Sequence, residues 1–392
     1  MKKMLMAAGM AAVMTACGTS AQKAATDAGN PFLAEYSTPF GVPPFDRIKV
    51  EHYKEAFLKG MEEQKKEIDA IVNQRSVPDF DNTIAAFDQS GELLNKVNTV
   101  FYGLNSCNTN DEMQTLNKEL TPLLSAHRDD ISLNPALFAR VKEVYERREQ
   151  LGLDKEQNKL LEETYKKFVR GGANLDSVDQ AKLRQLNSEI SMLQLTFGQN
   201  LLKETNAFRL VIDKEEDLAG LPESLVASAA EAAKSEGLEG EWLFTLHNPS
   251  VMPFLQYADN RELREKIFKG YINRGNNGNE TDNNEIVKKL VTLRLEKAKL
   301  MGYADYASYV LEDRMAKNEE NVYRLLNQIW TPAVAKAKEE LVDIQAEIKK
   351  EGANFTPEGW DWRYYFEKAK KAKFSLDENE IRPYLELNNV RD

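Results

Sequence analysis

Helical periodicity is the feature that most constrains the fold of this chain. From Val50 onward, apolar residues recur at steps of three and four. The longest such stripe consists of Leu183, Leu186, Ile190, Leu193, Phe197 and Leu201. This spacing places the apolar side chains on one face of a helix. Because the stripe lasts too few heptads for a separate dimerising coiled coil, we interpret it as a packing surface inside a mainly α domain.

Capping and proline signals mark the ends of the predicted helices. Ser177 precedes the long stripe and Gln180 follows three residues later, which predicts a capping box at the start of that helix. A second apolar stripe consists of Leu341, Ile344 and Ile348. Pro332 precedes this stripe, and we expect it to begin or kink the helix.

Two short segments carry β signals between the helices. Residues 208–212 and 242–246 are rich in aromatic and branched side chains. Between them, an Ala-rich helix is expected over residues 224–234, after Pro222 and before Gly237. The predicted fold class is therefore a large, mainly α, bundle-like fold with a minor two-stranded β element.

The amino terminus has the pattern of a lipoprotein signal peptide. A basic end and an apolar run occupy residues 2–14, and Met-Thr-Ala-Cys at residues 14–17 resembles a lipobox. The apolar run is too short to span a bilayer, which takes roughly 20 residues. We expect residues 1–17 to be the signal and Cys17 to carry the lipid. The alternative is an ordinary cleaved secretory signal with an incidental cysteine.

Lipidation of Cys17 has consequences for location and for disulfides. The protein would be exported and anchored to a membrane, on the periplasmic side of the outer membrane in a Gram-negative cell. Residues 18–30 are small and polar, which suits a flexible tether, and folding is expected to begin near Pro31 in an extended, proline-rich segment. Cys107 would be the only thiol left, so no intramolecular disulfide is available. We expect Cys107 to be buried or half-buried and assign it no role.

The charge balance excludes one class of partner. The chain has 52 Lys and Arg against 63 Asp and Glu, a net charge of −11. A surface of this sign repels nucleic acid phosphates, so we expect no nucleic acid partner.

The histidines do not form a zinc-binding pattern. The chain contains three, His52, His127 and His247, and none has another His four residues away. We expect each to be a surface histidine or a hydrogen-bonded core histidine. No Ser or Cys nucleophile motif is present either. We therefore assign no catalytic residue and no metal ligand to this chain.

The loop at residues 273–279 is rich in Asn and Gly and invites a calcium or phosphate interpretation. An EF-hand register that starts at Asn273 puts Asn284 at the twelfth position, where a bidentate Glu is needed. The Gly-Lys-Ser or Gly-Lys-Thr of a phosphate loop is missing. We interpret the loop as a tight turn, followed by a helix that Asp282 and Glu285 cap.

Five segments carry a family resemblance that covers nearly everything after the tether. They are RGGANL at 170–175, NAF at 206–208, LAGLP at 218–222, YINRGNNGNETDNNEIVKKLVTLRLEKAKLMGYADYASYV at 271–310 and WDWRYY at 360–365. In this order they resemble the thimet oligopeptidase family of zinc metallopeptidases, especially its bacterial peptidyl-dipeptidase (Dcp) branch.

The resemblance implies a mostly helical ellipsoid split by a deep channel. It also implies one zinc ion at the channel floor and hydrolysis of short peptides by a monomer. Residues 31–247 would form an amino-terminal helical domain, and residues 248–392 the start of the catalytic region. With the rest of the fold outside this sequence, we expect the apolar stripe at residues 183–201 to lack a partner.

The family holds zinc through a His-Glu-x-x-His helix and a further Glu, none of which can be placed on this sequence. The chain is therefore expected to stop before the active site and to be inactive alone. We favour the amino-terminal part of a lipid-anchored zinc metallopeptidase of the peptidyl-dipeptidase or oligopeptidase type. The alternative is a non-catalytic peptide-binding or scaffolding lipoprotein derived from that family.

Overall fold

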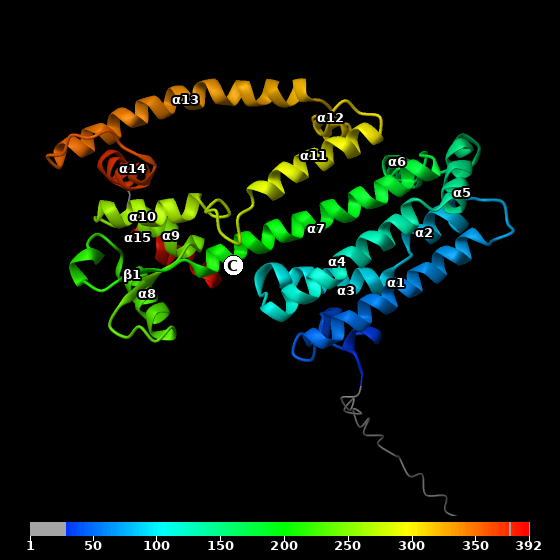
Figure 1. The fold of residues 1–392 in the computed structure, drawn as a ribbon, viewed down its shortest axis with the longest axis horizontal. Helices are drawn as coiled ribbons and strands as arrows, with labels where there is room; N and C mark the ends of the chain where they lie inside the picture. The colour runs from blue at the N-terminus through cyan, green and yellow to red at the C-terminus, as the bar shows by residue number, and fades with distance from the viewer. Residues whose placement is uncertain (1–28, 376–377, 392) are drawn as a thin grey trace, which may run out of the picture.

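Helices make up most of the structure, as the periodicity predicted (Figure 1). The computed structural model describes residues 29–375 and 378–391. The predicted signal, Cys17 and nearly all of the predicted tether lie outside these residues. No helix in the described part of the chain is long and apolar enough to cross a membrane.

The amino-terminal helices pack around two cores. These helices are α1 (Val50–Val72), α2 (Ala86–Asp88), α3 (Glu92–Cys107), α4 (Asp111–Ser132), α5 (Pro135–Glu146) and α6 (Lys155–Arg170), with a π-helical turn (Phe80–Ala85) before α2. The first core lies between α1, α3 and α4, where the rings of Tyr53 and Phe57 each contact Phe101, at centroid distances of 5.1 and 5.5 Å. The second core joins α1, α5 and α6 and buries Leu137 and Leu161.

The segment before α1 is not fully extended. It contains two short 3-10 turns, Pro31–Leu33 and Pro39–Gly41, so the prediction of a non-helical segment is wrong for these two turns. A proline that fixes φ near −65° starts each of them. Phe32 is buried against Tyr53, with ring centroids 5.1 Å apart, which ties this segment to the first core.

Cys107 is exposed, contrary to the expectation that it is buried or half-buried. It is the last residue of α3. The buried residues of that helix, Val97, Val100 and Phe101, lie earlier along it, and Leu104 is its last residue packed against the core.

The long stripe belongs to α7 (Ser177–Ala207). Asp176 is the N-cap, because its carboxylate accepts hydrogen bonds from the backbone N–H groups of the second and third helical residues. The predicted capping box is wrong by one position, since Ser177 is already helical and the Gln180 side chain donates instead to the Leu175 carbonyl, at 3.1 Å. A carboxylate in the preceding position leaves no backbone donor for the Ser177 hydroxyl to satisfy.

The apolar stripe of α7 has a partner within the chain, contrary to expectation. Leu186 and Ile190 are buried against Leu290 and Leu293 of α11 (Asn284–Leu300). On its other side, α7 packs against α4. The partner was missed because α11 lies about a hundred residues further along the sequence, and periodicity carries no information on which faces meet.

A small sheet and three helices follow α7. They are β1 (Leu210–Ile212), α8 (Glu223–Ser235), β2 (Trp242–Phe244), α9 (Asn248–Tyr257) and α10 (Arg261–Ile272). The two strands are antiparallel, with Val211 opposite Leu243, so the predicted β element and the mainly α fold class are confirmed. One buried cluster holds both strands together with α9 and α10, including Leu210, Phe244 and Phe254. This cluster spans both sides of the domain boundary predicted between residues 247 and 248, which stays a prediction.

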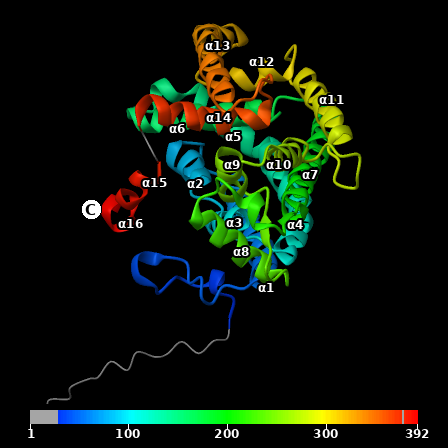
Figure 2. The ribbon, with the colours of Figure 1, turned by 90° about the vertical axis from the view of Figure 1, so that its left-hand side faces the viewer.

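The last helices cross over the rest of the molecule. They are α11, α12 (Tyr306–Leu311), α13 (Glu319–Lys350), α14 (Gly359–Phe374), α15 (Glu378–Ile381) and α16 (Leu387–Arg391). Figures 1 and 2 show α13 and α14 lying side by side. The second half of α13 buries Ile344 and Ile348 against Tyr364 and Tyr365 of α14, as the second stripe predicted. Pro332 does not begin this helix, which continues through it.

A buried ion network joins α10 to α14. Asp361 is 0% exposed and accepts from Arg264 at 3.0 Å and from Arg261 at 2.7 and 2.9 Å. Arg264 is 1% exposed, and its remaining N–H groups donate to the carbonyls of Ala258, Asp259 and Trp360. Burial by itself raises the pKa of Asp361, but hydrogen bonds from Arg261, the Glu358 N–H and Arg264 outweigh it and hold that pKa below its usual range.

Replacing Asp361 with Ala should leave Arg264 as an uncompensated buried charge. We expect the substitution to lower the free energy of unfolding by about 3–5 kcal/mol, measured by urea titration. Glu339→Ala is the matched control, because Glu339 pairs with Lys336 on the surface of α13 and should have little effect. The contribution of Asp361 is present above its unfolded-state pKa and is lost as the pH falls through its lower folded-state pKa. Equal losses in the two variants would contradict this role.

Candidate functional site

The three histidines lie in separate parts of the structure. His52 is on α1, where its Nδ1 accepts the Lys49 N–H at 3.1 Å. His247 is the exposed N-cap of α9, and its ring contacts Thr245 and Asn206 at 3.1 Å. His127 is buried on α4. Within residues 29–375 and 378–391, no group of three or more His, Cys, Asp or Glu could hold a metal ion. The described residues therefore do not fit the zinc site that the family resemblance implies.

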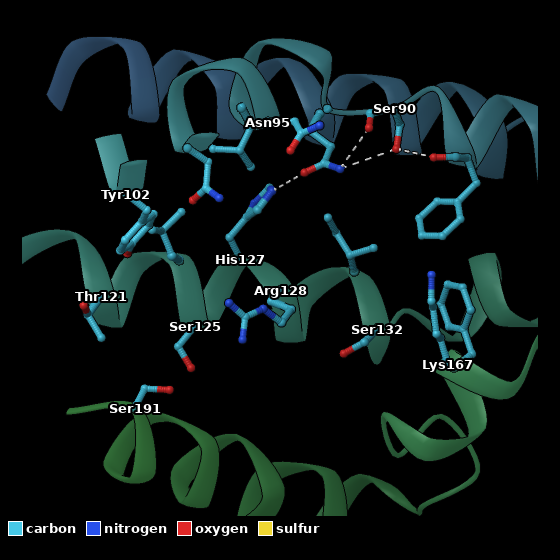
Figure 3. A pocket seen from close by; sticks show the side chains of 18 residues that line it. Ser90, Asn95, Tyr102, Thr121, Ser125, His127, Arg128, Ser132, Lys167 and Ser191 are labelled. Atoms are coloured by element: carbon cyan, nitrogen blue, oxygen red, sulfur yellow. Dashed lines mark hydrogen bonds between the residues drawn. The ribbon is translucent and has the colours of Figure 1, made fainter. Parts of the chain in front are cut away.

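A pocket of about 590 Å³ surrounds His127 (Figure 3). Six helices (α1, α2, α3, α4, α6 and α7) and the turn after α2 contribute to its walls, so residues distant in sequence meet there. Its polar lining consists of Gln64, Ser90, Asn95, Asn98, Tyr102, Thr121, Ser125, His127, Arg128, Ser132, Lys167 and Ser191. Apolar side chains, including Phe87, Leu94 and Phe168, complete the lining. A concave, partly apolar cavity with a few convergent polar groups is the usual form of a small-ligand site.

A hydrogen-bond chain fixes the tautomer of His127. The Gln64 amide nitrogen donates to the carbonyl and hydroxyl of Ser90, both at 3.4 Å, so the Gln64 oxygen is left to accept from His127 Nε2, at 2.7 Å (Figure 3). His127 Nδ1 is then a bare acceptor in the neutral ring, and it is buried without a partner. Burial, followed by the charge of Lys65, lowers the pKa of His127, while Asp130 opposes the shift. His127 is therefore neutral at neutral pH.

The charged side chains that line this pocket are all cationic. Arg128 and Lys167 line it, and no Asp or Glu does. Neither side chain forms a hydrogen bond or an ion pair with any residue that the structure describes. In a chain with a net charge of −11, this makes the pocket a local positive region on an acidic molecule.

The Asn- and Gly-rich loop is held by one carboxylate of α7. Glu204 accepts from the Asn279 amide at 2.7 Å and the Thr281 hydroxyl at 2.8 Å through one oxygen, and from Asn277 and the Gly275 N–H through the other. Burial alone raises the pKa of Glu204, but these hydrogen bonds together lower it. The loop is thus a structural turn whose donors face inward to a protein carboxylate.

The end of this loop departs from prediction. The N-cap of α11 is Asn283, and the carboxylate of Asp282 just before it accepts the N–H of Asn284, the first helical residue, at 2.8 Å. Glu285 does not take part in the cap and pairs instead with Lys288. Gly275 adopts a positive φ of 73°, as expected for a tight turn.

Comparison with known proteins identifies the family. Residues 254–392 match the family model described as peptidase family M3. The chain is 41% identical over 361 residues to the dipeptidyl carboxypeptidase of Escherichia coli (strain K12), covering 92% of this chain and 53% of that protein. It is 30% identical over 356 residues to oligopeptidase A of Haemophilus influenzae, covering 89% and 52%. The chain belongs to peptidase family M3. It spans about half the length of the curated relatives that it matches.

Residues in the segments that resemble the family form contacts between parts of the chain that are distant in sequence. Arg170 of the first segment lies over the Tyr309 ring, 4.6 Å from its centroid, and pairs with Glu312. Asn206 of the second bonds His247. Asp361 of the last forms the buried ion network. The resemblance to the family is confirmed, and in this structure these residues form packing, hydrogen-bond and ion-pair contacts.

Sequence reasoning missed the pocket of this M3 chain. The sequence predicts a surface or hydrogen-bonded core histidine at His127, which its burial and its bond to Gln64 confirm, but it marks neither Arg128 nor Lys167 as part of a pocket. No local pattern could have marked them, because Gln64, Lys167 and Ser191 come from different helices than His127. The lack of acidic residues in the pocket lining can be seen only in the folded structure.

Glu204→Gln should release the loop at residues 273–283. All four partners of Glu204 donate, so the new amide N–H₂ would face two donors and leave them unsatisfied. We expect the N–H groups of Gly275 and Gly278 to exchange faster with deuterium, by a local loss of about 1–3 kcal/mol. The same amides in the unsubstituted protein should lose protection as the pH falls through the lowered pKa of Glu204.

The control is Glu280→Gln in the same loop, since Glu280 pairs only with Lys203 at the surface among the described residues. It should leave loop exchange unchanged. Similar exchange in both variants would show that Glu204 does not hold the loop.

Proposed function

We propose that this chain is the amino-terminal portion of a lipid-anchored zinc metallopeptidase that hydrolyses short peptides. The type is that of a peptidyl-dipeptidase or oligopeptidase. The observation that carries the proposal is the 41% identity to a dipeptidyl carboxypeptidase across 92% of this chain. The match of residues 254–392 to peptidase family M3 supports it independently of that one relative.

One zinc ion would supply the chemistry in the full-length enzyme, by activating a water molecule against the peptide carbonyl. The described residues offer no site for it, so we assign its ligands to sequence beyond this chain. The part proposed for this chain is to build one wall of a substrate channel and to position the remainder of the fold.

An exposed apolar face on α13 supports the proposal that this chain packs against the remainder of the fold. Tyr323, Leu326, Ile329 and Trp330 are 51–69% exposed. Their spacing places them on one side of the helix, unlike Ile344 and Ile348, which α14 covers. Contiguous apolar surface of this kind marks an interaction site. We propose that the face packs against the part of the relatives' fold that this sequence does not include, and that the complete protein is a monomer.

Purified residues 18–392 should neither bind stoichiometric zinc nor cleave peptides. The complete reading frame should bind one zinc ion and cleave short peptides until a chelator is added. Metal analysis and a fluorogenic peptide assay measure both properties. Chelator-sensitive cleavage by residues 18–392 would overturn the assignment of the ligands. Failure of the complete protein to cleave would favour the non-catalytic peptide-binding or scaffolding alternative.

A double substitution distinguishes the proposed contact of α13 from a general loss of stability. Leu326→Glu combined with Trp330→Glu should destabilise the complete protein and leave the melting of residues 18–392 unchanged, because both side chains are exposed in this chain. Equal melting of the complete protein with and without the substitutions would contradict the proposed contact.

We also propose that Cys17 is acylated and anchors the exported protein to a membrane, on the periplasmic side of the outer membrane in a Gram-negative cell. Each buried methylene of an acyl chain contributes about 0.8 kcal/mol, so several chains anchor firmly. Mass spectrometry of the amino-terminal peptide should find lipid on Cys17, and Cys17→Ala should move the protein to the soluble fraction. Cys107→Ala is the control and should leave fractionation unchanged. An unmodified terminus elsewhere would contradict the proposal.

A further inference from the structure

We propose that Asn277 is a deamidation site, and that Glu204 restrains the reaction by holding the Asn- and Gly-rich loop closed. Asn277 is followed by Gly278, and no other Asn of the 392 residues precedes a glycine. Conversion of Asn277 to a carboxylate would release the loop from α7. The proposal does not depend on whether the complete protein cleaves peptides.

The reaction needs only the chain and water. The backbone nitrogen of Gly278 gives up its proton to hydroxide and attacks the side-chain carbonyl carbon of Asn277. A bond forms between these two atoms, the bond from the carbon to the amide nitrogen breaks, and that nitrogen leaves as ammonia. Water then opens the cyclic imide to aspartate or isoaspartate, so nothing is oxidised or reduced. Glycine favours the attack, because it has no β-carbon to crowd the nitrogen.

The surroundings of the pair leave room for this chemistry. Asn277 and Gly278 are both exposed, so water reaches the amide and the cyclic imide. Among the described residues, no atom beyond the chain neighbours would lie within 4 Å of a β-carbon built on Gly278. Gly278 also has a positive φ of 63°, so the chain turns tightly at this point.

Hydrogen bonds restrain the same two residues. The Asn277 amide donates to Glu204 and to the Asn273 carbonyl, each at 3.0 Å. The Gly278 N–H donates to Asp282 at 2.8 Å. A side chain held by two bonds turns toward the attacking nitrogen less often, and a bonded N–H gives up its proton less readily. Glu204 is the main restraint, because the same carboxylate holds the rest of the loop.

The product cannot make the contacts of the amide. A carboxylate at position 277 accepts hydrogen bonds where the amide donated one, so it would face Glu204 as a second acceptor of like charge. Two carboxylates that share a site repel each other unless one takes up a proton. Glu204 belongs to α7, and the loop joins α10 to α11. The reaction would therefore loosen this connection in one direction only.

Peptide mapping of the full chain, incubated for weeks at mildly alkaline pH, tests the site. The tryptic peptide of residues 275–288 contains Asn277 and four other Asn, which serve as internal references. Asn277 should convert fastest. Glu204→Gln should speed this conversion roughly five-fold or more, because the loop loses its acceptor, and Glu280→Gln should leave it unchanged. Conversion of Asn277 no faster than that of its neighbours, or equal rates in the two variants, would overturn the proposal.

The variant Asn277→Asp imitates one product and tests the consequence by deuterium exchange. The Gly275 N–H, which Glu204 accepts, should exchange roughly five-fold or more faster than in the unsubstituted chain. Asn276→Asp is the matched control, since it adds the same charge one residue earlier and its oxygen can still accept from Asn284. It should leave exchange unchanged. Equal exchange in the two variants, or equally faster exchange in α1, would contradict a local release of the loop.

Discussion

The packing of α7 against α4 on one side and α11 on the other joins the early and late parts of the described structure. Apolar side chains supply part of the contact, and a chain of buried and half-buried polar side chains supplies the rest. Asn187 of α7 donates to Asp129 of α4 at 2.8 Å and accepts from Lys297 of α11 at 2.6 Å. Further along α7, Ser191 lines the pocket and Glu204 holds the Asn-rich loop. One helix thus positions both features.

Local signals in the sequence were enough to predict the elements of this fold, and long-range contacts were not. The stripe from Leu183 to Leu201 predicted α7, and the branched residues near Ile212 predicted β1, because both signals come from residues a few positions apart. The partner of the stripe was missed, since the sheet and three helices separate Leu290 from α7 along the chain. The exposure of Cys107 was missed for a related reason, because where a helix leaves its core depends on its neighbours.

The family-like segments and the pocket around His127 differ in the same way, because the first can be recognised in the sequence and the second only in the folded structure. The five family-like segments were recognisable in the sequence, yet only the structure gives their residues a physical part, such as the ion pair between Arg264 and Asp361. The pocket around His127 had no signature at all. Its defining properties are an absence of carboxylates and an unfilled lone pair on Nδ1, and both depend on which side chains meet rather than on their spacing along the chain.

The distribution of buried and exposed apolar side chains bears on how much of the M3 fold this chain supports alone. The cores around Phe101, Leu161, Phe244 and Leu290 are each closed by side chains within the described residues. Hydrophobic burial is the main stabilising contribution to folding, and these cores supply it from side chains of the described residues. The face of α13 around Trp330 is different, because it is held at both ends by α12 and α14 and remains uncovered between them. This open apolar side is the surface that the proposed contact with the remainder of the fold would cover.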